Sequence, residues 1–263
     1  METNVYVISD VHVDYKENLD WMLSLTNHEN DVLIIPGDIS NDISKTLEFL
    51  YQLKQKFREV FFTPGNHDLW ITDKACGNSL NKLEYLLSSS KTIGVKVTPA
   101  KVDELWIVPL LSWYDSSLSS EPLTAKDKEE LKCWSDFFYC SWPSGFKPTD
   151  LYERNESVLN SFEEDDPKRI ISFSHMIPRR DLLPPTPLLN LHFLPHVVGS
   201  TRLEHQIRRL RPCVHCFGHS HINTDLTIEG IRYVQNALGY PSERKAYGMT
   251  PSLVRVWPSS AHS

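Results

Sequence analysis

The chain has 263 residues, of which 40% are hydrophobic and 23% charged, a composition typical of a globular protein. No apolar run approaches the roughly 20 residues of a membrane helix, and a strand-like run from Val5 leaves no room for a signal peptide. The net charge of -7 argues against a protein whose main role is to cover the phosphate backbone of a nucleic acid. The five scattered cysteines do not form the disulfide framework of a secreted protein. We expect one domain over 1–263 in the reducing cytoplasm, without a membrane partner.

Strand-like and helical patterns alternate along most of the chain. Apolar runs predict strands at 5–9, 32–36, 60–64, 105–110, 170–174 and 214–218. Helical spacing predicts helices at 18–25, 44–57, 79–89, 126–138, 151–165 and 202–210. A hairpin at 225–237 and a last strand at 253–257 follow, and the proline-rich stretch 182–189 is expected to be a surface loop. Because several strands are apolar throughout, both of their faces should be covered, which predicts an α/β/β/α sandwich with two mixed sheets.

Polar residues recur where five of the predicted strands end. In chain order they are Asp10, His12, Asp38, Asn66, His67, His175, His219 and His221. Ligand sites of α/β sheets form outside the carboxyl ends of strands, so these residues are expected to meet in one crevice. Taken singly, each is explained as well by a turn or a loop mouth. Turn chemistry alone, however, does not require histidines at separate strand ends.

The chemistry of this set favours metal binding. Apart from His67, it offers two carboxylates, one amide and four imidazoles, which suit first-row divalent metals. Seven donors are too many for one ion. Two ions with four protein ligands each would need roughly eight contacts, which these residues supply if one carboxylate bridges.

Five short motifs in a fixed order resemble the calcineurin-like metallophosphoesterases. The motifs are SDVH (9–12), GD (37–38), GNHD (65–68), the lone histidine of SFSH (172–175) and GHSH (218–221), and they extend over almost the whole chain. The resemblance implies one metal on Asp10, His12, Asp38 and His221 and a second on Asp38, Asn66, His175 and His219, with Asp38 bridging. It also implies that His67 binds no metal and acts on the phosphoryl and leaving groups of the substrate.

A dinuclear site of this kind predicts a metal-dependent phosphoesterase that hydrolyses a phosphomonoester or a phosphodiester. Two ions can lower the pKa of a bridging water and align the hydroxide for in-line attack. Asp38 would bridge the ions and His67 would protonate the leaving group, while Asp68 is expected to brace the turn. Manganese, iron and zinc all suit these ligands. The alternative is a metal-binding scaffold of the same fold that serves in a protein assembly without turnover.

The sequence indicates less about the substrate, for which a small phosphoester is expected. Arg179 and Arg180 follow His175 and could bind phosphate, although charged loop residues are as often simply solvated. Trp113 and Tyr114 are the first candidates for selecting a substrate. Two departures argue against specific relatives: ISND (39–42) lacks the Asp-Arg-Gly element of protein serine/threonine phosphatases, and Asn41 replaces the metal-binding tyrosine of purple acid phosphatases.

Two further clusters are given structural interpretations. The arginines that would suit a nuclease, Arg202, Arg208, Arg209 and Arg211, lie partly on one helical face, so nucleic acid is not an expected partner. Cys213 and Cys216 form a CVHC motif within a predicted strand. Their position favours core packing over a redox pair or a zinc site.

Overall fold

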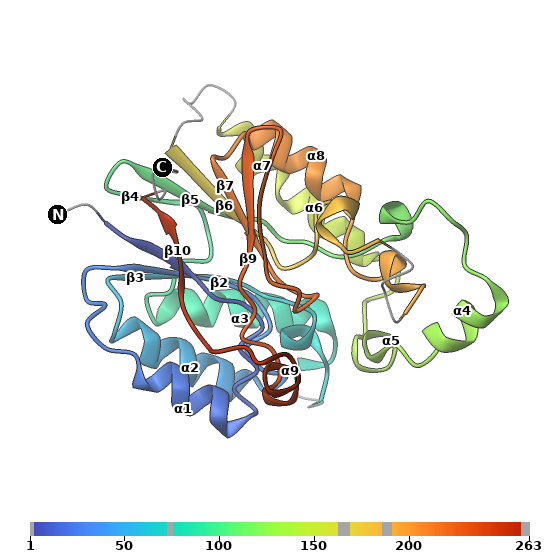
Figure 1. Ribbon diagram of the computed structural model, residues 1–263, viewed down its shortest axis with the longest axis horizontal. Helices are drawn as coiled ribbons and strands as arrows, with labels where there is room; N and C mark the ends of the chain where they lie inside the picture. Colours follow the sequence, from blue (N-terminus) through green and yellow to red (C-terminus); the bar gives the residue numbers. More distant parts are fainter. Residues whose placement is uncertain (1–2, 73–75, 163–168, 186–190, 259–263) are drawn as a thin grey trace.

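The computed structural model describes residues 3–72, 76–162, 169–185 and 191–258, and its strands form two sheets (Figure 1). The first sheet has the order β10-β1-β2-β3. Its strands are β1 (Val5–Val7), β2 (Val32–Pro36), β3 (Glu59–Thr63) and β10 (Val254–Trp257). The first three are parallel and β10 pairs antiparallel with β1.

The second sheet has the order β4-β5-β6-β7-β9-β8. Its strands are β4 (Ala100–Val102), β5 (Leu105–Pro109), β6 (Ile170–Phe173), β7 (Val214–Phe217), β8 (Thr224–Ile228) and β9 (Ile231–Gln235). The four central strands are parallel, and the two edge strands β4 and β8 are antiparallel to their neighbours. Both sheets are therefore mixed, as the sequence predicted.

The side chains of β2 show why its sequence is apolar throughout. Val32 and Ile34 face the second sheet and pack in one core with residues of β6 and β7. Leu33 and Ile35 point the other way and pack against α2, a helix over Ile43–Lys54. Because successive side chains of a strand alternate between faces, a strand covered on both sides needs apolar residues at every position.

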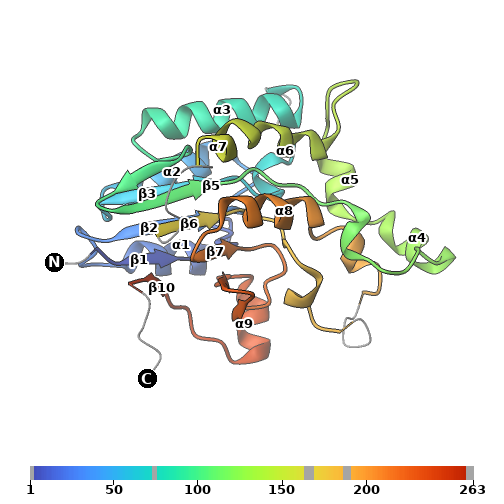
Figure 2. The ribbon, with the colours of Figure 1, turned by 90° about the horizontal axis from the view of Figure 1, so that it is seen from above.

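Helices cover the outer faces of both sheets (Figures 1 and 2). The first sheet is covered by α1 (Lys16–Ser24), α2 and α3 (Ser79–Thr92). The second is covered by α6 (Leu151–Arg154), α7 (Glu156–Asn160) and α8 (Thr201–Leu210). The short helices α4 (Ala125–Leu131), α5 (Ser135–Tyr139) and α9 (Pro241–Tyr247) lie toward the end of the sandwich where the parallel strands finish.

Several elements differ from the sequence predictions. The helix predicted at 126–138 is two helices, α4 and α5, because the chain turns at 132–134 and buries Asp136 on the second. The helix predicted at 151–165 is likewise divided into α6 and α7, and its residues 163–165 lie outside the described chain, as do 186–189 of the proline-rich stretch. The three-residue strand β4 and the helix α9 were not predicted.

The cysteine pair at the start of β7 lies where the sequence predicted it. Cys216 is fully buried between the two sheets, and Cys213 packs against the same core with its thiol donating to the carbonyl of Ile170. Both side chains therefore serve packing. Across the described ranges, no helix combines the length and the apolar character needed to cross a membrane.

Candidate metal centre

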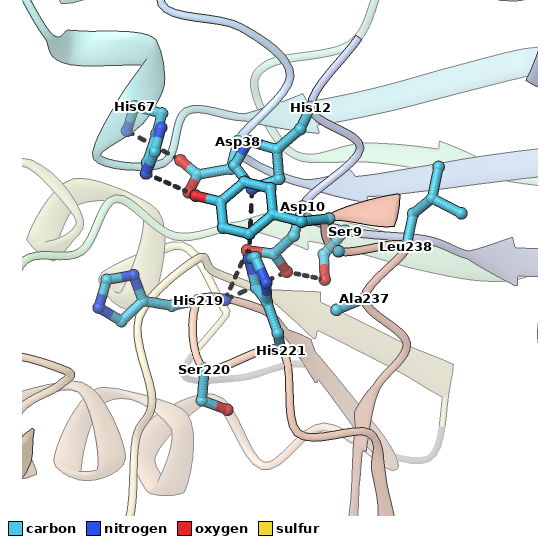
Figure 3. A network of polar contacts seen from close by, with 12 residues as sticks. Ser9, Asp10, His12, Asp38, His67, His219, Ser220, His221, Ala237 and Leu238 are labelled. Carbon is cyan, nitrogen blue, oxygen red and sulfur yellow. Dashed lines mark hydrogen bonds and ion pairs between the residues drawn. The ribbon is translucent and has the colours of Figure 1, made fainter. Parts of the chain in front are cut away.

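The predicted ligands lie together on loops after β1, β2, β3, β6 and β7. Figure 3 shows five of them, namely Asp10, His12, Asp38, His219 and His221. Backbone hydrogen bonds connect these loops: Asp10 N–H donates to the carbonyl of Gly37, and His12 N–H donates to that of Asp38, each at 3.0 Å. The amide of His219, on a loop of the other sheet, donates to the Asp10 carboxylate at 2.9 Å. The site is thus built across both sheets.

The backbone of these loops is strained at the predicted ligands. In the described chain nine non-glycine residues have positive φ. Five of the nine are predicted ligands, namely Asp10, His12, Asp38, His219 and His221, with φ between 44° and 77°. L-residues rarely adopt this conformation, and it persists at functional sites where the surrounding structure enforces it.

Two glycines let the loops after β2 and β3 approach closely. A Cβ on Gly37, whose φ is +78°, would lie 2.4 Å from the backbone nitrogen of Gly65. A Cβ on Gly65 would lie 2.2 Å from a carboxylate oxygen of Asp38. Side chains at these positions would push the two loops apart.

Three acceptor atoms converge in the group that contains His175. Asn66 Oδ1 lies 3.0 Å from His175 Nε2 and 2.9 Å from His219 Nδ1, and the two nitrogens are 3.2 Å apart. The other ring nitrogens donate to the carbonyls of Pro36 (2.7 Å) and Val197 (3.2 Å). When both rings are neutral, their remaining lone pairs face the amide oxygen, and a bound cation would stabilise that arrangement. The Asp38 carboxylate completes the group, 3.4 Å from His175.

A second group contains Asp10, His12 and His221. His221 Nε2 lies 3.2 Å from His12 Nε2 and 3.4 Å from the Asp10 carboxylate. The other nitrogen of His221 donates to Glu243 at 2.7 Å. A carboxylate that accepts from the far nitrogen of a metal ligand fixes the orientation of the ring.

Electrostatics also favours a positive charge at each group. Burial lowers the pKa of His175, but the Asp38 carboxylate more than offsets this and raises it to about 9. In the same way, Asp10 and Glu243 outweigh the effect of burial and raise the pKa of His221 to about 10. Burial alone would raise the pKa of Asp10, yet His221 lowers it to about 2. A proton or a bound cation can supply the charge that these carboxylates stabilise.

The donor set therefore fits divalent metal ions. Each group combines imidazole nitrogens with a carboxylate oxygen. Among the residues that the structure describes, no cysteine belongs to either group. Hydrogen bonds to Pro36, Val197 and Glu243 orient three of the four histidine rings. Oxygen and nitrogen donors of this kind are suited to manganese, iron or zinc.

His67 lies beside the cluster and outside both groups. Its Nε2 is 3.9 Å from the Asp38 carboxylate, and its ring stacks on Trp70 with ring centroids 3.7 Å apart. The side chain is 19% exposed and lines a cavity of about 420 Å³ together with Asp38, Asn66 and His219. The imidazole is thus held next to the cluster while its edge stays accessible from the cavity.

Comparison with known proteins agrees with this geometry. The profile of the calcineurin-like phosphoesterase family matches residues 3–223. The chain belongs to this family. It is accordingly a hydrolase of the phosphoesterase class, and its metal-ligand groups agree with the metal dependence of the family.

Individual relatives of this phosphoesterase are distant but similar over nearly their full length. An [acyl-carrier-protein] phosphodiesterase, PptH of Mycobacterium tuberculosis, is 25% identical over 94% of this chain and 82% of its own. The uncharacterized protein L509 of Acanthamoeba polyphaga mimivirus is 22% identical over 91% of this chain and 92% of its own. The crystal structure of the phosphopantetheinyl hydrolase PptH from M. tuberculosis shares the fold, with a TM-score of 0.84, 23% identity and coverage of 100% and 98% of the two chains.

Asp68 holds the backbone of this phosphoesterase under the ligands. Its carboxylate accepts hydrogen bonds from the amides of Asp38, Ile39, Ser40 and Gly65 at 2.8–3.2 Å. It therefore braces the turn, as the sequence predicted.

The two arginines expected to contact substrate lie away from the candidate ligands. Arg179 pairs with Asp181 and Glu204 at 2.8 Å, and together with Arg180 it lines a different cavity beside α8. The structure thus does not bring these two arginines to the metal cavity of the phosphoesterase. Trp113 and Tyr114 are buried and stacked on each other. The ring of Tyr114 also stacks beside that of His219, with ring centroids 6.5 Å apart.

Two carboxylates near the ligands were missed by sequence reasoning. Glu243 lies on α9, where Pro241 at the helix start and a glutamate two residues later were a readable helix signal. Asp136 lies on α5 and accepts a hydrogen bond from Asn66 at 2.9 Å. It belongs to an aromatic and acidic stretch with no motif, so only the folded chain shows this contact.

Proposed function

We propose that this phosphoesterase is a dinuclear metal-dependent phosphodiesterase. One ion would be held by Asp10, His12, Asp38 and His221, and the other by Asp38, Asn66, His175 and His219. The adjacent groups of converging donors support two sites. Burial lowers the pKa of His12 to about 3, and the negative charge of Asp38 acts against this lowering as it does at His175. Asp38 therefore acts on one ring of each group, which supports its place between the ions.

The chain's own residues would divide the work around the ions. When bound, two divalent ions lower the pKa of a water and neutralise charge on the phosphoryl oxygens. His67 would donate a proton to the departing alkoxide, which leaves poorly without one. Its backbone amide donates to Asp38 at 2.9 Å and its ring stacks on Trp70, so the imidazole is fixed relative to the cluster.

The lining of the cavity carries the inference of a diester. Among the described residues, none of those that line it is an arginine or a lysine. A phosphodiester carries one negative charge, whereas a monoester at neutral pH carries nearly two and gains more from cationic side chains. Beyond the ligands the wall is largely apolar, with Trp70, Trp134, Leu191, Leu194 and Val198. Such a wall suits an organic group on the ester.

The likeness to PptH indicates which diester to test first. Because the similarity to this [acyl-carrier-protein] phosphodiesterase extends over 94% of the chain, we propose phosphopantetheine linked to a carrier protein as the substrate class. The natural product of hydrolysis would be the free carrier protein. Release of phosphopantetheine from such a carrier, measured by the mass of the protein, checks this finer proposal.

Metal content and turnover test the proposal together. The protein is stripped with a chelator, reconstituted with manganese and analysed for bound metal, and then assayed on bis-p-nitrophenyl phosphate and p-nitrophenyl phosphate, with the stripped protein as control. We expect two ions per chain and faster turnover of the diester. At most one ion would overturn the dinuclear site, and faster turnover of the monoester would overturn the diester preference. Two ions without turnover of either ester would favour a scaffold.

A further inference from the structure

Asp136 is a buried carboxylate close to the metal ligands. It lies on α5, is 3% exposed and lines the metal cavity. One of its oxygens accepts from Asn66 Nδ2 at 2.9 Å and from the indole N–H of Trp70 at 2.5 Å, and the other accepts from the indole of Trp134 at 3.0 Å. The carboxylate is therefore surrounded by donors, which stabilises its charge.

The contact with Asn66 determines which end of the amide faces the cluster. A carboxylate can only accept, so the NH₂ group of Asn66 must point toward Asp136. The amide oxygen then points toward His175 and His219, at 3.0 and 2.9 Å. A flipped amide would place its oxygen against the carboxylate of Asp136 and its hydrogens toward the cation site. Both contacts would be repulsive.

We propose that Asp136 is a positioning residue for Asn66, which it holds with its oxygen toward one of the two ions. This inference rests on the proposed assignment of Asn66 as a ligand. Asp136 itself would not coordinate metal, because it lies outside both ligand groups and its oxygens already accept from the three donors around it. Its charge would also polarise the amide and make the oxygen of Asn66 a better ligand.

A purely structural role gives different consequences. If Asp136 only anchored α5 through the indoles of Trp70 and Trp134, its removal would lower stability without acting on one ion in particular. Trp134→Phe is the matched control, because it removes a donor to the same carboxylate but leaves the Asn66 contact in place. Asn66→Ala removes the proposed ligand itself and so identifies which of the two ions depends on it.

The experiment measures metal affinity and melting temperature for the whole chain. Stripped wild type, Asp136→Ala, Asp136→Asn, Trp134→Phe and Asn66→Ala are titrated with manganese by calorimetry and melted without metal. In Asp136→Ala we expect the ion that Asn66→Ala weakens to bind about 10- to 100-fold less tightly, the usual effect of losing an outer partner, and the other ion to be unchanged. Asp136→Asn should recover part of the affinity, because its amide oxygen can still accept from Asn66. Trp134→Phe should leave both affinities unchanged.

A double mutant separates coupling from general damage. In the Asn66→Ala background, Asp136→Ala should weaken binding no further, because the group that it positions is gone. Equal weakening of both ions, additive effects in the double mutant, or wild-type affinities in Asp136→Ala would overturn the positioning role. A wild-type protein that binds only one ion would instead contradict the proposed function, so the two failures can be distinguished.

Discussion

The two ligand groups lie side by side but are held in different ways. In the group of His175 and His219, the far ring nitrogens donate to backbone carbonyls, and Asp136 holds the amide of Asn66. In the group of Asp10 and His12, the ring of His221 is held by the side chain of Glu243, which is 34% exposed. Backbone acceptors can move only with their strands and loops, whereas a partly exposed side chain can rotate.

If two ions bind as proposed, this difference would make one ion fixed and the other adjustable in position. His175 is fully buried and Asn66 is 3% exposed, so changes at these positions leave little room for rearrangement. His12 packs against Tyr240, with ring centroids 4.6 Å apart, and Tyr240 begins the helix that carries Glu243. Three kinds of variant test whether the two groups are separate in function: one expected to affect both groups, one expected to affect neither, and one expected to affect a single group.

The largest effect is expected from Asp38→Asn, which changes the residue proposed to bridge the two ions. Loss of the charged bridge should weaken both ions by more than about 100-fold, since even an outer partner contributes about 10- to 100-fold. Turnover should fall to background. Metal titration measures the affinities, with Asn66→Ala as the comparison that should weaken mainly one ion. An Asp38→Asn protein with two tightly bound ions would show that the bridge is assigned wrongly.

His67→Ala should come next, because it changes a residue outside both groups. Both ions should remain bound while turnover falls by about 10² to 10⁴, the usual contribution of a positioned acid or base. The turnover rate on an alkyl phosphodiester should fall further than the rate on a p-nitrophenyl ester, because an alkoxide leaves badly without a proton. The measurements are metal content, melting temperature and the ratio of the two rate losses. Equal losses on both substrates, with lower stability, would mean that His67 only supports the turn.

Much of the architecture could be predicted because its signals are local. The run 32–36 is apolar at every position, and the structure shows the reason in Val32 and Leu33, which face opposite cores. The meeting of the candidate ligands was predictable because Asp10, His175 and His221 each follow a strand, and the carboxyl ends of parallel strands meet at one edge. In these cases the position in the sequence determines the position in space.

The parts that the sequence did not predict depend on contacts between distant segments. Asn66 and Asp136 are 70 residues apart, and no spacing rule connects a strand-end asparagine with a carboxylate on a short helix. Arg179 shows the converse, since its position after a ligand-bearing strand indicated phosphate, but Glu204 on α8 pairs with its guanidinium. Which charged groups become partners depends on tertiary packing.

The smallest effect is expected from Glu243→Gln, which acts on one group only through the hydrogen bond from the ring of His221. Gln can still accept from the ring of His221 and from the amide of Tyr240, so the start of α9 should survive and the melting temperature should change little. Loss of the negative charge makes the ring a weaker ligand. The ion of that group should therefore bind about tenfold less tightly, at the low end of the effect of changing a residue that orients a metal ligand. Titration beside Asp136→Asn gives the matched comparison, because each variant neutralises the carboxylate of a different group. If Glu243→Gln instead lowers the affinity for the ion that Asn66→Ala affects, the two groups respond as one unit through Asp38. Their different anchoring would then not make them independent in function.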